Sequence, residues 1–250
     1  SMTNYLSADL RRILHKQSFL GSVGAFAVLF AVLVFIYFNP SFTAEMYAAK
    51  ATSFLSFFPL IIGVFVFMSV YADDFKCRSM QVAIGYGMPR SRIILAKLLE
   101  SASLLFGTAV IMGILVLCTP VILGLAPTTQ QLMSLALTVA AEMFRALGYL
   151  ALSAIPVFFS QDAVGGIIAY VLLSSKTVYI VLSMVLGQEL LVNTIGDLTQ
   201  YLYTTQLYMV KADLMGGNPF IFPFVAALLI YIFLPTVIAV IGFRKKELEF

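Results

Sequence analysis

Long apolar stretches separated by short polar ones make up most of this chain. A helix needs about 20 predominantly apolar residues to cross a bilayer. The chain is uncharged over 101–141, which is too long for one crossing, and Pro120, Gly124 and Pro127 provide a break within that run. The pattern predicts an all-α membrane protein that forms a single transmembrane domain over 1–250. Its six transmembrane helices are expected at about 18–38, 54–72, 98–123, 131–159, 163–186 and 220–243.

Two other segments are helical candidates that would not cross the membrane. Over 3–17, apolar residues such as Leu6, Leu10 and Ile13 follow a helical period, with charged residues, Asp9 among them, toward the other side. This predicts an interfacial helix in the headgroup layer, and the charged flank of a membrane anchor would show the same pattern. Segment 187–219 contains few charges and ends in a Gly-Gly-Asn-Pro turn, so we expect either re-entrant helices between spans five and six or a structured surface loop.

Composition excludes a soluble domain and nucleic-acid binding. Hydrophobic residues make up 61% of the chain and charged residues 11%, against about 25% charged residues in a typical soluble domain. The mean hydropathy is +1.00. A net charge of +3, without a basic run interleaved with aromatic residues, gives no reason to expect a nucleic-acid partner.

The positions of Lys and Arg orient the predicted spans, because cytoplasmic loops are enriched in these residues. Only Lys50 and Lys211 fall in predicted outside loops, while Arg145 and Lys176 fall within spans. The remaining cations all lie on one predicted side of the membrane: Arg11, Arg12, Lys16, Lys76, Arg78, Arg90, Arg92, Lys97, Arg244, Lys245 and Lys246. We therefore predict a multi-pass protein of the plasma membrane with both termini in the cytoplasm and membrane lipid around it.

The segment 73–92 concentrates charge between spans two and three. Together with Lys97 just beyond it, the segment is expected to lie outside the lipid, since a charge at the centre of a span costs roughly 2.5 to 3.5 kcal/mol. Asp73 and Asp74 are predicted to open a short helix, and Gly85, Gly87 and the following Pro89 to end it. By composition alone, this is an ordinary basic cytoplasmic loop with a helical turn.

The order of residues in this segment resembles a known family. An acidic pair leaving span two, a short basic stretch, a Gly-x-Gly-x-x-Arg turn and then Arg92 and Lys97 leading into span three resemble the permease subunits of bacterial ABC-2 type transporters, which are driven by ATP. With six spans and both termini inside, the resemblance covers essentially the whole chain. It implies that the segment is the coupling helix, which docks into a groove of the ATPase subunit. The residues that match this role are Asp73, Asp74, Phe75, Lys76, Arg78, Met80, Gly85, Gly87, Arg90 and Arg92.

The resemblance also implies partners and a substrate class. Two permease chains, expected to be identical, would pair and bind two copies of an ABC ATPase subunit. ATP and Mg²⁺ would bind in that ATPase, so no cofactor is expected in this chain. Small permeases of this kind resemble those that export amphipathic peptides such as lantibiotics and modulin-type toxins, or confer immunity to them; export of a drug, a lipid or a polysaccharide stays an alternative.

Three charged residues fall inside predicted spans. Glu142 and Arg145 are three residues apart in span four, so they share a helix face and can pair. At 1.5 Å per residue, Lys176 in span five should lie at about the depth of Arg145, and Glu142 could compensate both cations. Intramembrane charge usually marks a functional site. The cluster is interpreted as a contact for a translocated molecule, as a hinge, or as a buried ionic group that fixes helix register.

Catalytic motifs are not found in the sequence. It contains no Gly-x-x-x-x-Gly-Lys-Ser/Thr loop, no His-Glu-x-x-His and no Gly-x-Ser-x-Gly, so we expect neither enzymatic activity nor a metal site in this chain. The rival hypotheses are an ion- or proton-coupled secondary carrier that uses Glu142, Arg145 and Lys176, and a purely structural membrane subunit.

Overall fold

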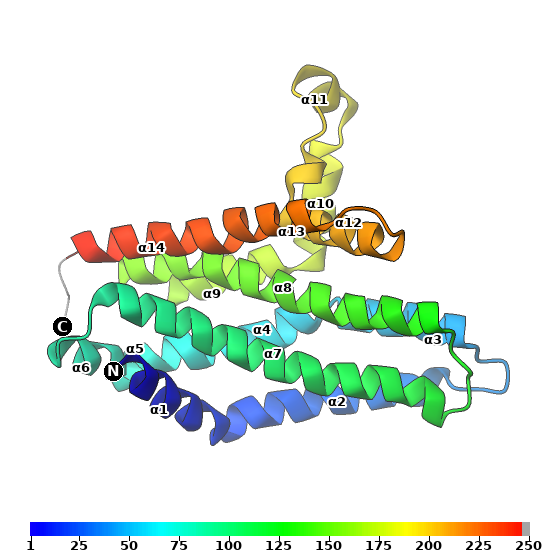
Figure 1. Ribbon diagram of the computed structural model, residues 1–250, viewed down its shortest axis with the longest axis horizontal. Helices are drawn as coiled ribbons and strands as arrows, with labels where there is room; N and C mark the ends of the chain where they lie inside the picture. The colour runs from blue at the N-terminus through cyan, green and yellow to red at the C-terminus, as the bar shows by residue number, and fades with distance from the viewer. Residues whose placement is uncertain (247–250) are drawn as a thin grey trace.

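Helices form one elongated bundle in the computed structural model, which describes residues 1–246 apart from the side chain of Cys77 (Figure 1). Within this range the chain forms helices and no strands. Five helices are long and apolar enough to cross a membrane, and α9 with α10 would make a sixth if that bent pair is one span. The fold is therefore compatible with the predicted multi-pass membrane protein.

The first half of the chain contributes α1 (Met2–Leu14), α2 (Gln17–Tyr37) and a long interrupted helix over Ala44–Lys76. The helix before α2 and the first span thus lie where the sequence predicts them. The second span is longer than the predicted 54–72. It comprises α3 (Ala44–Leu55), α4 (Phe58–Phe67), the π-helix η1 (Met68–Ala72) and α5 (Asp73–Cys77), and it is interrupted next to Pro59, as expected for a residue without an N–H.

Two long helices follow a short surface helix. The surface helix α6 (Ser79–Gly85) is separated from α5 by Arg78, whose φ of 55° is left-handed. Gly87, with a φ of 88°, then turns the chain into α7 (Arg90–Ile122), as predicted from Gly85, Gly87 and Pro89. The next helix, α8 (Thr129–Ser160), begins with a capping box in which Thr128 and Gln131 exchange hydrogen bonds of 3.1 and 2.9 Å.

The span predicted over 163–186 is interrupted in the structure. The structure breaks it into α9 (Val164–Ser174) and α10 (Lys176–Leu186), bent by 65°. Ser175 between them has an extended backbone, and its hydroxyl accepts from the N–H of Val178, so it caps a new helix instead of continuing the old one. In Figure 1, α10 leaves the bundle sideways, with α11 (Glu189–Thr194) at its far end.

The rest of the chain returns to the bundle. A 3₁₀ turn, η2 (Thr199–Tyr201), leads into α12 (Tyr203–Met215), which packs against α8. The last span consists of α13 (Ile221–Leu228), the π-helix η3 (Leu229–Phe233) and α14 (Leu234–Lys245). The segment 187–219 therefore contains the helices α11 and α12.

The centre of the bundle is α8, which packs against α3, α4, α7, α9, α12 and α14. Gly148 of α8 allows one close approach, because a Cβ at this position would lie 2.4 Å from the ring of Tyr203 on α12. The hydroxyl of Tyr203 donates to the carbonyl of Phe144 at 2.7 Å, so the ring is fixed over α8.

Both ends of the described chain lie at the same end of the bundle. Figure 1 shows α1, α5, α6, the start of α7 and the end of α14 together at this end, with the α2–α3 and α7–α8 connections at the opposite end. We call it the basic end, because these elements contain the cations assigned above to one side of the membrane.

Candidate functional site

The segment 73–92 does not form the isolated surface helix that the sequence suggests. Asp73 and Asp74 continue the second span without a break from η1, so the prediction that they open a helix at its positive end is wrong. Asp73 forms an ion pair with Lys16 at the start of α2. Asp74 is fully buried and accepts a hydrogen bond from Ser79. The break in the helix comes later, at Arg78.

The predicted coupling residues divide into buried and exposed sets. Met80 is buried, and Phe75 packs against the core. Arg90 is partly buried, and its Nη1 donates to the carbonyls of Phe243 at 2.6 Å and Lys246 at 2.5 Å, which ties the start of α7 to the end of α14. The exposed residues of the segment are Lys76, Arg78, Val82, Gly85, Tyr86, Gly87, Pro89 and Arg92.

A buried ionic cluster lies directly beneath this segment. Its centre is Lys97 of α7, whose side chain is fully buried although the sequence suggested a position outside the lipid. The Lys97 Nζ lies 2.7 Å from Asp9 Oδ2 on α1, 3.1 Å from Asp74 Oδ1 on α5 and 3.6 Å from Glu100 Oε2 on α7. The Lys97 cluster, as we call these four residues, thus joins α1, α5 and α7 through one ammonium group.

Acidic groups outnumber cations in the Lys97 cluster. Three carboxyl groups surround one lysine, and Arg12 adds a second cation by bonding to Asp9 at 2.7 Å. Burial alone would raise the pKa of the Asp9 carboxyl, but a hydrogen bond with Glu100 and the charge of Lys97 more than offset this and hold that pKa below its ordinary value. The second carboxyl oxygen of Asp74 is buried without a hydrogen-bond partner among the described residues.

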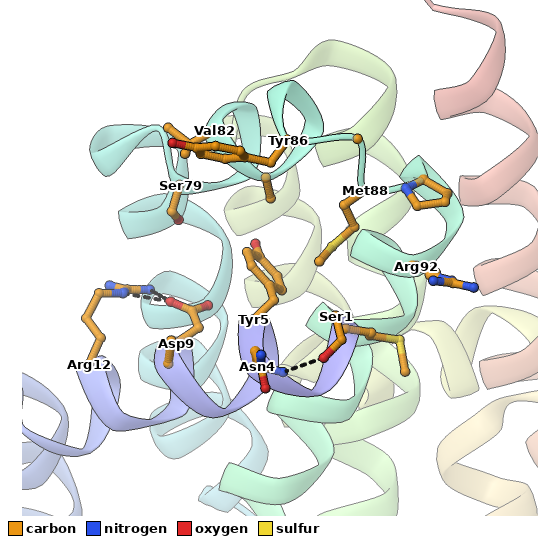
Figure 2. Close-up of a pocket in the computed structure, with 15 residues that line it drawn as sticks. Ser1, Asn4, Tyr5, Asp9, Arg12, Ser79, Val82, Tyr86, Met88 and Arg92 are labelled. Atoms are coloured by element: carbon orange, nitrogen blue, oxygen red, sulfur yellow. Dashed lines mark hydrogen bonds and ion pairs between the residues drawn. The ribbon is translucent and has the colours of Figure 1, made fainter.

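A groove of about 760 Å³ opens between α1 and α6 at the basic end (Figure 2). Tyr5, Asp9 and Arg12 line it from α1, while Val82 and Tyr86 line it from α6. Figure 2 shows Tyr5 pointing from α1 toward α6 and Tyr86 lying along the rim. Tyr86 is 90% exposed and Val82 55% exposed, so the rim presents apolar surface at an end of the bundle that is otherwise strongly basic.

The predicted pair of Glu142 and Arg145 forms in the middle of α8. Arg145 Nε lies 2.8 Å from Glu142 Oε2, and the hydroxyl of Tyr208 on α12 donates to Glu142 Oε1 at 2.9 Å. Arg145 also donates to two backbone carbonyls, at 2.6 Å to Ser56 and at 3.5 Å to Ser174. We call Glu142, Arg145 and Tyr208 the Arg145 cluster.

Both of these carbonyls belong to helix ends. Ser56 is the C-cap of α3, and Ser174 is the last residue of α9. The final carbonyls of a helix have no partner within it and form the negative end of its dipole. The guanidinium of Arg145 therefore satisfies two interrupted helices at once, which in an apolar bundle is the condition for breaking a helix without exposing its backbone.

Lys176 lies at the predicted depth, because it follows closely on Ser174, which Arg145 contacts. It is not a partner of Glu142, however. Lys176 is the first residue of α10, its side chain is exposed, and it forms no ion pair within residues 1–246. Both oxygens of Glu142 are already engaged by Arg145 and Tyr208, so the expectation that Glu142 compensates both cations is wrong.

Sequence reasoning missed Asp9, Glu100 and Tyr208 as members of these clusters. The spacing of Lys97 and Glu100, three residues apart at the start of a span, was a usable indication, since opposite charges at this spacing pair on one helix face. Asp9 had been assigned to the charged face of its helix, whereas the structure buries it against Lys97. Nothing in the sequence indicates which distant helix supplies a partner.

Comparisons of the chain with protein-family models, with curated proteins and with solved structures found no match. Among the described residues, no group of three or more His, Cys, Asp and Glu side chains is placed to hold a metal ion. The function of the chain must therefore be argued from its own residues and contacts.

Proposed function

We propose that this chain is the membrane-spanning subunit of an ATP-driven exporter of the ABC-2 type. Two copies would pair, each would dock a separate ATPase subunit at the basic end, and the complex would move an amphiphilic substrate, such as a peptide, out of the cytoplasm or the inner leaflet. ATP and Mg²⁺ would bind in the ATPase.

The observation on which the proposal depends is the combination of an exposed surface and a buried anchor in the segment 73–92. Tyr86 and Arg92 are exposed and line the groove between α1 and α6, and Arg78 is exposed directly before Ser79, which also lines it. An acidic protein surface with an apolar side chain would find complementary charge and shape there. A few residues further back, Asp74 bonds to Lys97 in the interior. A force on the exposed part is thereby applied to α1 and α7 as well as to α5.

The contacts between these helices support the transfer of force from the exposed part of 73–92 to α1, α5 and α7. The Lys97 cluster is made of side chains on three elements, so a displacement of α6 and α5 cannot leave α1 and α7 unchanged without separating Lys97 from Asp74 or Asp9. Bringing charges out of such a pair in a buried site is costly. The basic end therefore moves as a unit, as a site that receives work from an ATPase must.

A secondary carrier is the second candidate, because α9 and α10 form a broken helix beside a buried charged pair, an arrangement that carriers use to bind ions. The contacts at the break argue against it. The carbonyls that would coordinate an ion are bonded by Arg145, which stays charged at any physiological pH, and Glu142 already has a partner on each oxygen. No free carboxylate is left there to carry a proton.

Capture of the ATPase tests the proposal. The chain would be co-expressed with a candidate ATPase, a soluble protein with a phosphate loop encoded by a neighbouring reading frame, and purified through a tag on this chain only. We expect co-purification in the wild type and a loss of at least tenfold when Arg78, Tyr86 and Arg92 are all replaced by Ala, because all three side chains are exposed at the proposed docking surface.

The matched control is Lys50→Ala, which removes a cation on α3 toward the other end of the bundle, where its ammonium lies 4.2 Å from the centre of the Tyr37 ring. This variant should retain the ATPase fully. Undiminished capture by the triple variant, with wild-type yield of the membrane chain, would contradict docking at this site.

A further inference from the structure

A second cavity lies within the bundle, away from the basic end. It has a volume of about 420 Å³ and opens between α3, α8, α12 and the first turn of α10. Hydroxyl groups and three charged side chains contribute to its lining. The residues that matter here are Ser53, Ser56, Thr138, Glu142, Lys176 and Lys211.

Positive charge is in excess around this cavity. Lys176 and Lys211 both line it, while Glu142 is its only carboxylate. Glu142 is already paired with Arg145 at 2.8 Å and accepts from Tyr208 at 2.9 Å, so it does not balance either lysine. Lys211 donates to the hydroxyl of Thr138 at 2.7 Å, and Lys176 has no ion pair within the described residues.

The depth of the cavity in the bundle restricts what could supply the missing negative charge. On α8, Glu142 comes 13 residues after Thr129 and 18 residues before Ser160. At 1.5 Å per residue these are roughly 20 and 27 Å, which puts the cavity near the middle of the span. The headgroup of a resident lipid lies about 15 Å from the bilayer centre, so an anion at this level belongs to a molecule that is crossing.

We propose that this cavity binds the anionic group, a carboxylate or a phosphate, of the amphiphile that the chain translocates. Lys176 and Lys211 provide the charge, and the hydroxyl of Ser53 provides a hydrogen bond. This inference rests on the proposed function for the crossing molecule, but the binding site itself belongs to this chain alone. A cation without a counter-ion near the middle of a bilayer is costly, and binding an anion relieves that cost.

Direct binding to the purified chain tests the site without any ATPase. In a neutral detergent, the dissociation constants of dodecyl phosphate, dodecanoate and dodecyltrimethylammonium would be compared, since the three share one alkyl chain. We expect at least one of the anions to bind tenfold or more tightly than the cation. Which of the two anions binds tighter identifies the group as a phosphate or a carboxylate.

Variants then assign the preference to the cavity. Replacing both Lys176 and Lys211 by Gln should reduce the anion preference to less than threefold, whereas Lys50→Gln should leave it unchanged. Lys176→Arg and Lys211→Arg together should retain the anion preference, and this variant keeps the test informative if the Gln variants fold poorly.

Equal binding of the three amphiphiles to the wild type, or an undiminished anion preference in a folded double Gln variant, would overturn the assignment. Since no ATPase is present, a chain that shows the preference but never captures an ATPase would refute the proposed function and leave the anion site intact.

Discussion

The Lys97 cluster and the Arg145 cluster are both buried, yet they join different parts of the protein. Lys97 bonds only to side chains, and those side chains come from α1, α5 and α7. Arg145 bonds to one carboxylate and to the backbone of two helix ends. The Lys97 cluster therefore holds whole helices together at the basic end, whereas the Arg145 cluster stabilises interruptions within helices near the middle of the bundle.

Removal of the Lys97 ammonium should have the largest effect. Lys97→Met leaves three buried carboxyl groups without their shared cation, and breaking a buried ion pair costs about 3–5 kcal/mol. We expect a large drop in the unfolding temperature of the purified chain in detergent, or no folded chain at all. Lys76→Met, an exposed neighbour, should change the unfolding free energy by less than about 0.5 kcal/mol.

Neutralising the acids should reverse much of this loss. If Asp9→Asn, Asp74→Asn and Glu100→Gln are added to Lys97→Met, the unpaired charges are gone and folded yield should recover in part. An unfolding temperature for Lys97→Met equal to that of the wild type would mean that the cluster does not hold the three helices together.

Removal of the Glu142 carboxylate should have a smaller but clear effect. Glu142→Ala leaves Arg145 with carbonyl partners only and deprives Tyr208 of its acceptor, at a cost of about 3 kcal/mol. Glu142→Gln keeps one acceptor oxygen for Arg145, and its NH2 group can donate to the Tyr208 hydroxyl, so it should cost less than Glu142→Ala. The unfolding temperature is measured on the purified chain, and export is measured in the proposed complex with an ATPase. Wild-type values for Glu142→Ala in both measurements would show that the Arg145 cluster contributes to neither stability nor export.

A change beside the Arg145 cluster tests the backbone rather than the charges. In Gly148→Ala the new methyl group would meet the ring of Tyr203, and overpacking of this kind costs about 1–3 kcal/mol. At Gly165, where a Cβ would meet nothing within 4 Å, the same substitution should be neutral or slightly stabilising. If the two variants unfolded at the same temperature, the close contact of α8 and α12 would be in doubt.

The exposed residues of the segment 73–92 should contribute least to stability. Replacing Arg78, Tyr86 and Arg92 together by Ala should leave the unfolding temperature within a few degrees of wild type, because surface substitutions are usually within about 0.5 kcal/mol each. A large destabilisation would mean that these side chains support the fold and are not available to a partner.

Hydrophobic patterning predicted most of the helices but not their interruptions. It identified the spans that became α2, α7 and α8, and the local spacing of Glu142 and Arg145 predicted their pair. The predicted third span begins at residue 98, whereas α7 begins at Arg90. The prediction begins late because a charged residue such as Lys97 is expected to face water.

Long-range contacts explain what the pattern could not predict. The bend between α9 and α10 is marked in the sequence only by the polar run Ser174-Ser175-Lys176, and what makes it stable is the distant guanidinium of Arg145. In the same way, Asp9 is buried only because Lys97 lies opposite it, 88 residues later in the chain. Partners of this kind depend on the assembled bundle rather than on local spacing.

Photo-crosslinking from position 86 tests directly whether an ATPase docks at the basic end. A photoreactive residue in place of Tyr86 would be compared with one in place of Phe35, which is 83% exposed on α2, in membranes that contain both this chain and the ATPase. We expect a crosslink to the ATPase from position 86 and none from position 35. No ATPase adduct from position 86, or labelling of a cysteine placed there by a membrane-impermeant reagent added outside intact cells, would contradict it.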